Sequence, residues 1–144
     1  MIDPKNKLIE RLSIYHKPSS EMPSAVQKHD LSIMFFSEGI SKLGSAPTRM
    51  AEVLGCGIPV VVNEGVGDVA DIVKKNNIGV VVEGQSKEQM KKAIESLLIL
   101  IKDPNLNTRC RTTAENLFSL EVGTEDYRKI YKTIINKKDK SCVA

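Results

Sequence analysis

The stretch Ser41–Asn63, SKLGSAPTRMAEVLGCGIPVVVN, combines a loop, a predicted helix and a predicted strand. Apolar residues recur at helical spacing in the run Thr48–Leu54, and Pro47 before it has the φ angle that suits a first helical turn. We expect a helix to begin at about residue 46 or 47 and to end at Gly57 in a left-handed conformation. The β-branched run Ile58–Val62 then predicts a strand buried on both faces, as in a parallel sheet.

The start of this predicted helix has features of an anion site. The first N–H groups of a helix have no partner within it, and the helix dipole places partial positive charge there. Ser45 and Thr48 add hydroxyl groups, and Lys42 and Arg49 add positive charge, which together suit a phosphate or diphosphate. The same residue types also form ordinary helix caps, and by themselves they favour that structural interpretation.

Glu52 lies just beyond the first turn of the same predicted helix. Its carboxylate is near enough to the amino end to reach a ligand held there, and it can accept two hydrogen bonds from a ribose diol. A solvated surface glutamate is the alternative interpretation.

The segments on either side alternate between strand and helix patterns. Before this stretch the patterns predict a strand at Leu12–Tyr15, a short helix at Glu21–Lys28 and a second buried strand at Leu31–Phe36. After it they predict a helix at Val69–Asn76 capped by Asp68, a strand at Gly79–Glu83, and then helices from Ser86 to about Ile101, from Asn105 to Phe118 and from Glu121 or Thr124 to Ile135.

This order predicts an α/β fold with a Rossmann-like parallel sheet of about four strands, flanked by helices and followed by a helical C-terminal end. In such sheets ligands bind beyond the carboxyl ends of the strands, where the loop before Thr48 is expected to lie. The turn Glu64–Asp68 is expected at the same edge, as a tight turn between a strand and a helix. Tyr127 and Tyr131 share a face of the last predicted helix, which indicates packing more than a site.

The composition excludes several classes of protein. A chain of 144 residues with 41% hydrophobic and 27% charged residues is typical of a globular domain, and a net charge of +3 is too small to indicate nucleic-acid binding. There is no secretory apolar segment and no apolar run long enough to span a membrane.

The three cysteines are odd in number and widely spaced, which indicates reduced thiols in the cytoplasm and a buried Cys56. The two histidines, His16 and His29, have no neighbours at ligand spacing, and no Asp-x-Asp pair occurs in the chain. We therefore expect neither a metal ion nor another cofactor.

The motifs resemble the carboxy-terminal domain of group 1 retaining glycosyltransferases of the GT-B architecture. The most specific piece is the serine-proline-threonine-basic loop, followed by Glu52 and then by Cys-Gly-x-Pro-Val-Val. The similarity extends through residues 41–82 and continues into FSLEVGTEDYRKIYKTI near the end, so that it covers roughly Asp30 to Ile135.

The resemblance implies a binding site for a nucleoside diphosphate sugar. It implies that Glu52 binds the ribose and that the backbone at Pro47 and Thr48 contacts the diphosphate. A second glutamate of the family, which contacts the donor sugar, is replaced here by Gly44. The loop resembles that of a subgroup of the family that has a lysine near this position. The resemblance therefore makes Lys42 the candidate for the charged role in place of the glutamate.

Within this resemblance Ser45 or Lys42 would contact the sugar or the β-phosphate, and Arg49 would add positive charge. The implied reaction is transfer of a sugar to an acceptor with retention of configuration.

The resemblance also implies a division into domains. Residues 1–136 are expected to be a donor-binding domain truncated at its N-terminal side, followed by a polar basic tail at 137–144. The expected partner is the N-terminal acceptor domain of a parent enzyme, through which contact with a membrane surface could occur, and the chain alone is expected to be inactive. Two alternatives stay open: a stand-alone nucleotide-binding or regulatory module, and a degenerate interaction domain, for which Gly44 is the strongest argument.

Overall fold

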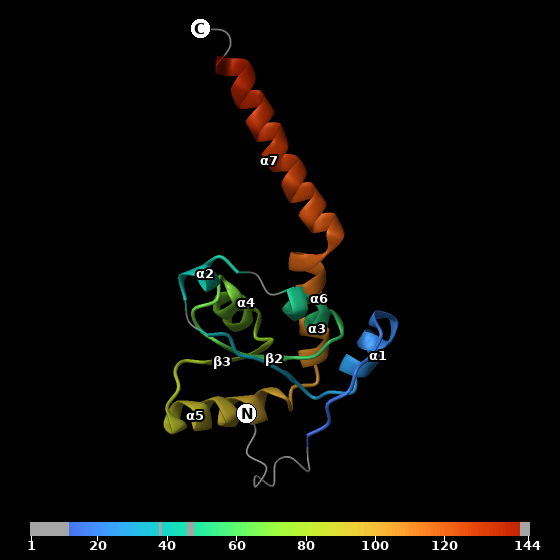
Figure 1. The fold of residues 1–144 in the computed structure, drawn as a ribbon, viewed down its shortest axis with the longest axis vertical. Helices are drawn as coiled ribbons and strands as arrows, with labels where there is room; N and C mark the ends of the chain where they lie inside the picture. Colours follow the sequence, from blue (N-terminus) through green and yellow to red (C-terminus); the bar gives the residue numbers. More distant parts are fainter. Residues whose placement is uncertain (1–11, 38, 46–47, 142–144) are drawn as a thin grey trace.

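The computed structural model describes residues 12–37, 39–45 and 48–141, with side chains described up to residue 136 (Figure 1). The elements follow in the order η2 (Ser19–Glu21), α1 (Met22–Val26), β1 (Ser32–Met34), α2 (Ile40–Leu43), α3 (Thr48–Gly55), β2 (Val60–Asn63), α4 (Val69–Asn76), β3 (Gly79–Val82), α5 (Lys87–Leu100), α6 (Leu106–Phe118) and α7 (Leu120–Ser141).

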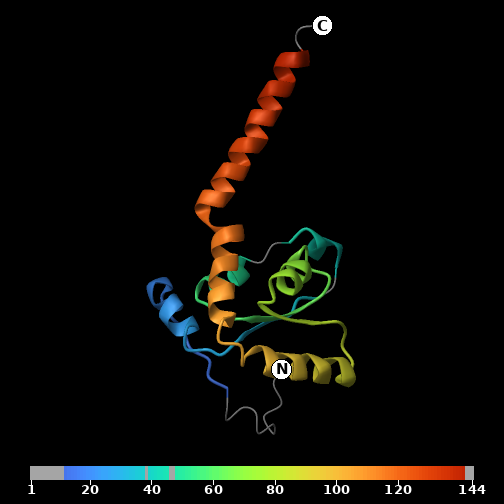
Figure 2. The ribbon, with the colours of Figure 1, turned by 180° about the vertical axis from the view of Figure 1, so that it is seen from behind.

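The three strands form one parallel sheet in the order β1-β2-β3. Met34 of β1 is level with Val62 of β2, which in turn is level with Val81 of β3. Helices α3, α4 and α6 lie on one side of the sheet and α5 lies on the other (Figures 1 and 2). This arrangement confirms the predicted α/β fold with a parallel sheet flanked by helices.

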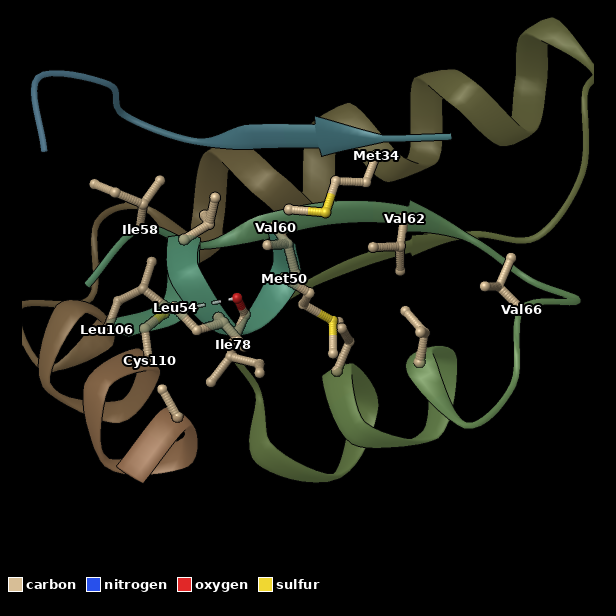
Figure 3. Packing of buried hydrophobic residues seen from close by; sticks show 14 residues of the cluster. Met34, Met50, Leu54, Ile58, Val60, Val62, Val66, Ile78, Leu106 and Cys110 are labelled. Carbon is tan, nitrogen blue, oxygen red and sulfur yellow. Dashed lines mark hydrogen bonds between the residues drawn. The ribbon is translucent and has the colours of Figure 1, made fainter. Parts of the chain in front are cut away.

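The core fills the space between the sheet and α3, α4 and α6 (Figure 3). Met50 and Leu54 of α3 point into it, next to Val60 and Val62 of β2. Cys110 of α6 is fully buried in the same cluster, and this burial raises the pKa of its thiol to about 11. Cys110 therefore acts as a small protonated core side chain.

The end of α3 confirms the prediction for Gly57, which has a φ angle of 81°. The N–H of Gly57 donates to the carbonyl of Leu54, and the N–H of Ile58 donates to the carbonyl of Val53. These two bonds close the helix in a Schellman motif and turn the chain directly into β2.

The strand predicted at Leu12–Tyr15 is wrong, because these residues are irregular and the sheet has three strands in the described part of the chain. Ile14 is 85% exposed, so no face of this segment meets the core that would stabilise a strand. The strand predicted at Leu31–Phe36 is shorter, and only one of its faces is buried: Met34 is 6% exposed, but Ile33 is 64% exposed.

Of four other local predictions, two are confirmed and two are wrong. Helix α4 spans the predicted residues, and Ser86 caps α5 through a capping box with Gln89. Asp68 stands at the cap position of α4 without a side-chain hydrogen bond, so its predicted capping role is wrong. Cys56 is half-buried instead of buried.

Helix α7 is longer than predicted and continues through residue 136 to Ser141. It projects away from the sheet in both views (Figures 1 and 2). The predicted packing of its tyrosines is wrong, because Tyr127 and Tyr131 are both exposed.

Candidate functional site

Two loops meet at the carboxyl edge of the sheet. One contains α2 and follows β1, and the other is the turn Glu64–Asp68 after β2. The N–H of Gly67 donates to the carbonyl of Lys42 over 3.0 Å, and a Cβ atom on Gly67 would collide with the carbonyl oxygen of Ser45. The loop with the predicted residues Lys42 and Ser45 therefore rests directly on the glycine turn.

Gly67→Ala is expected to destabilise the domain and to displace the Lys42–Ser45 loop. Gly67 has a φ angle of 45°, and the added methyl group meets the backbone of Ser45. Gly65→Ala is the matched control, because Gly65 also has a positive φ angle but open space around it. The control has only the conformational cost, about 1–2 kcal/mol.

Urea denaturation of both variants measures how much unfolding free energy each substitution costs. Equal losses of unfolding free energy would mean that the contact between the two loops is not tight.

Asn63 joins the ends of β1 and β2. Its Oδ1 accepts a hydrogen bond from the N–H of Phe36 (2.9 Å), and its Nδ2 donates to the carbonyls of Phe36 (2.9 Å) and Glu64 (3.0 Å). The side chain thus continues the pairing of the two strands beyond Met34 and fixes the position from which each loop leaves the sheet.

The predicted site residues of α3 lie on its exposed side. Thr48, Arg49 and Glu52 are exposed, whereas Met50, Val53 and Leu54 of the same helix are buried. Within the described residues, neither Arg49 nor Glu52 forms a salt bridge.

Glu52 lies between two surface hollows. The Thr48 hollow, of about 390 Å³, is lined by Thr48, Glu52, Asp68 and Phe118 together with apolar residues of α3 and α4. The Arg49 hollow, of about 740 Å³, lies between α1, α3 and the beginning of β1, and Arg49 and Glu52 line it. The structure therefore brings Glu52 and Thr48 together but places Arg49 on the other side of Glu52.

The remaining predicted residues lie in the loop before α3. Ser45 is half-buried, and its hydroxyl donates to the carbonyl of Ser41 over 3.1 Å, so its proton is already used within the loop. Lys42 is half-buried as well, and its carbonyl accepts the bond from Gly67. Pro47 lies outside the described residues.

Asp68 and Phe118 are among the residues of the Thr48 hollow that were not predicted as site residues. Asp68 comes from the turn after β2, and its position at the carboxyl edge was the signal that could have identified it. Phe118 ends α6 and has no such signal in the sequence. The hollow therefore combines a helix start, two carboxylates and an aromatic ring, a combination that suits a ligand with hydroxyl groups.

Two other carboxylates near this edge, those of Glu64 and Glu83, are already paired. Lys74 of α4 forms salt bridges with Glu83 (2.7 Å) and Glu64 (3.1 Å). Its hydrogen bond to Glu83, and then that to Glu64, raises the pKa of Lys74, and the bond to Lys74 lowers the pKa of Glu83. Glu64 thus ties the turn to α4, whereas Glu52 and Asp68 form no salt bridge within the described residues.

Two further properties concern only the part of the chain that the structure describes. No group of three or more potential metal ligands gathers there. None of its helices has the length and hydrophobicity to cross a membrane.

Comparison with known protein families finds a match to most of the chain. The family described as "Glycosyl transferases group 1" matches residues 6–117. This range includes Thr48, Glu52 and Asp68, and it ends just before Phe118 and α7. No curated protein and no solved structure matches the chain.

Proposed function

Because the chain belongs to the group 1 glycosyl transferases, we propose that it binds the nucleoside diphosphate sugar from which these enzymes transfer a sugar. The observation that carries this proposal is the Thr48 hollow, where the start of α3, Glu52 and Asp68 meet at the carboxyl edge of the sheet. This edge is where open parallel sheets bind their ligands.

In this proposal the diphosphate lies at the start of α3. The N–H groups of the first helical turn and the helix dipole attract the phosphate oxygens, and the hydroxyl of Thr48 can donate a further hydrogen bond. Lys42 and Arg49 increase the positive potential around this point. The same groups stabilise the negative charge that develops on the diphosphate as it leaves the sugar.

Glu52 binds the ribose in this proposal. Its carboxylate is exposed beside the diphosphate position and can accept a hydrogen bond from each of two neighbouring hydroxyl groups. Asp68 lines the same hollow and is the candidate acceptor for a hydroxyl of the donor sugar. Asp68 would then supply a carboxylate for the donor sugar, which glycine at position 44 cannot do.

The complete reaction would transfer the sugar to an acceptor with retention of configuration, and the acceptor would be held by a second domain. The chain by itself is then expected to bind nucleotides weakly and to transfer nothing. A binding module without transfer is the second candidate, and Gly44 favours it because glycine has no group for the donor sugar.

NMR titration of the ¹⁵N-labelled chain with UDP and GDP tests the proposal. We expect shifts of the amide signals of residues 48–52 and of Asp68, with smaller shifts when uridine replaces UDP. Inorganic pyrophosphate should move the signals of residues 48 and 49 but not that of Asp68. If UDP and GDP leave all these signals in place at millimolar concentration, the proposed donor site is wrong.

A further inference from the structure

A second polar hollow lies between the end of α4 and one side of α6. This Thr113 hollow has a volume of about 680 Å³ and is lined by three asparagines, three threonines, a lysine, an arginine and a leucine. It shares no lining residue with the Thr48 hollow, although Leu117 in the one and Phe118 in the other are neighbours on α6. No carboxylate lines it among the described residues, so its charged groups are all positive.

Thr113 of α6 is a buried polar residue in the wall of this hollow. It is 6% exposed, and its hydroxyl forms no hydrogen bond within the described residues. The hydroxyl of Thr133 in α7, in contrast, donates to the carbonyl of Lys129 one turn earlier. Buried polar groups are normally hydrogen-bonded, and an unpaired one is unfavourable. A ligand that hydrogen-bonds to Thr113 from the hollow would remove this cost.

Arg109 is held in the same wall by residues from outside the hollow. Its Nε donates to the carbonyl of Asn77 over 3.2 Å, and its Nη1 pairs with the carboxylate of Asp103. Its Nη2 is buried and has no partner in the part of the chain that the structure describes. The guanidinium group is therefore fixed beside the hollow with one donor unused.

Helix α6 begins at the hollow without a side-chain cap. Asn105 stands at the cap position and lines the hollow, but its side chain forms no capping hydrogen bond. The N–H groups of Asn107 and Thr108 have no backbone partner within the described residues. Lys75 of α4 lines the same hollow and forms no salt bridge in that part of the chain. The helix start, the helix dipole and Lys75 together favour an anion at this end.

Hydroxyl and amide groups continue from this end along α6. Thr108, Thr112 and Asn116 line the hollow at intervals of about one turn, and the first and last are about 12 Å apart along the helix axis. Threonine hydroxyls and asparagine amides can both donate and accept hydrogen bonds, as the hydroxyls of a sugar do. The hollow is therefore longer than a phosphate ion requires and suits a polar ligand with an anionic group at one end.

We propose that the Thr113 hollow binds a sugar that carries a phosphate or a carboxylate group. The anionic group lies between Lys75 and the start of α6. The sugar hydroxyls hydrogen-bond to Thr112, Thr113 and Asn116. This binding is separate from nucleotide binding at the Thr48 hollow and does not depend on it.

NMR titration of the ¹⁵N-labelled chain tests the proposal with four probes: glucose 6-phosphate, glucuronate, glucose and inorganic phosphate. We expect at least one of the two acidic sugars to shift the amide signals of residues 107–113 and of Lys75. The one that binds more tightly identifies the anionic group. Glucose alone and phosphate alone should bind about ten-fold more weakly, because each makes only part of the contacts.

Four results of this titration would overturn the proposal. The first is that neither acidic sugar moves these signals at millimolar concentration. The second is that phosphate binds as tightly as the acidic sugars, which would mean an adventitious ion only. The third is that glucose does so, because the anionic group would then have no role. The fourth is that the acidic sugars shift residues 48–52 instead, since they would then occupy the Thr48 hollow.

Thr113→Val removes the buried hydroxyl and keeps the shape of the side chain. We expect it to weaken binding of the acidic sugar about ten-fold, which corresponds to the loss of one hydrogen bond. Its unfolding free energy should not fall, because the lost hydroxyl has no partner in the folded chain. Thr133→Val is the matched control, since Thr133 lies on α7 away from the hollow. Equal affinity of the two variants would overturn the role of Thr113.

Lys75→Gln tests the anionic end separately. We expect it to weaken binding of the acidic sugar about three- to five-fold, as is typical of an exposed charge pair, and to leave binding of glucose unchanged. Lys92→Gln is the control, because Lys92 is an exposed lysine of α5 on the other side of the sheet. If Lys75→Gln binds the acidic sugar as tightly as Lys92→Gln does, the anionic group does not lie at Lys75 and the proposed orientation is wrong.

Discussion

Nucleoside diphosphate binding is expected to fall about 100-fold when Glu52 is replaced by alanine, because two hydrogen bonds to a charged group contribute roughly 1.5 kcal/mol each. Glu52 is exposed, so the substitution should leave the unfolding free energy nearly unchanged. Isothermal titration with UDP, or NMR titration if binding is weak, measures the loss. The comparison of UDP with 2′-deoxy-UDP then isolates the ribose contact.

The native chain should prefer UDP over the deoxy nucleotide, and the Glu52→Ala variant should bind both equally. Glu88→Ala is the control, since Glu88 is an exposed glutamate near the start of another helix, α5. If Glu52→Ala keeps the preference for UDP, another residue binds the ribose, although the diphosphate could still lie at the start of α3. If both variants bind UDP as the native chain does, Glu52 has no part in the site.

Asn63→Ala is expected to lower the unfolding free energy by about 2–4 kcal/mol, because three hydrogen bonds are lost and the backbone of Phe36 loses both of its partners. The loop after β1 would also lose its fixed starting point. Denaturation with urea gives the change in stability, and the amide signals of residues 40–45 report the position of the loop.

Asn76→Ala is a matched control for this prediction. Asn76 is also half-buried, but its side chain makes one hydrogen bond, to the carbonyl of Ile72. Its loss should cost about 1 kcal/mol. If the two variants were equally stable, Asn63 would not link the strand ends as the structure indicates.

Predictions that depend on neighbouring residues in the chain agree well with the structure. The bounds of α4, the end of α3 at Gly57 and the capping box of Ser86 follow from periodicity and from turn residues. The segment Leu12–Tyr15 shows the limit of this reasoning. Its residue types favour a strand, but a strand also needs a neighbour to pair with and a core face to bury, and this segment has neither in the described residues.

The candidate site also has some features that follow from spacing along the chain and others that depend on the folded loop. Thr48 and Glu52 are four residues apart on a helix, so their shared side of α3 could be predicted from spacing alone. The orientation of the Ser45 hydroxyl could not be predicted from spacing, because this hydroxyl turns inward to Ser41 in the folded loop. Whether a residue faces a ligand or its own loop depends on how the loop packs.

By itself the sequence determined the parallel α/β class, the helix that presents Glu52 and the likeness to sugar-transferring enzymes, because periodicity, turn residues and motif spacing are local properties. Only the tertiary structure decided that Asp68 and Phe118 join Thr48 in one hollow, that Arg49 lies in another, and that β1 has no neighbouring strand on its outer edge within the described residues. These features arise where separate elements meet, and the relative position of such elements depends on how the sheet and its helices pack together.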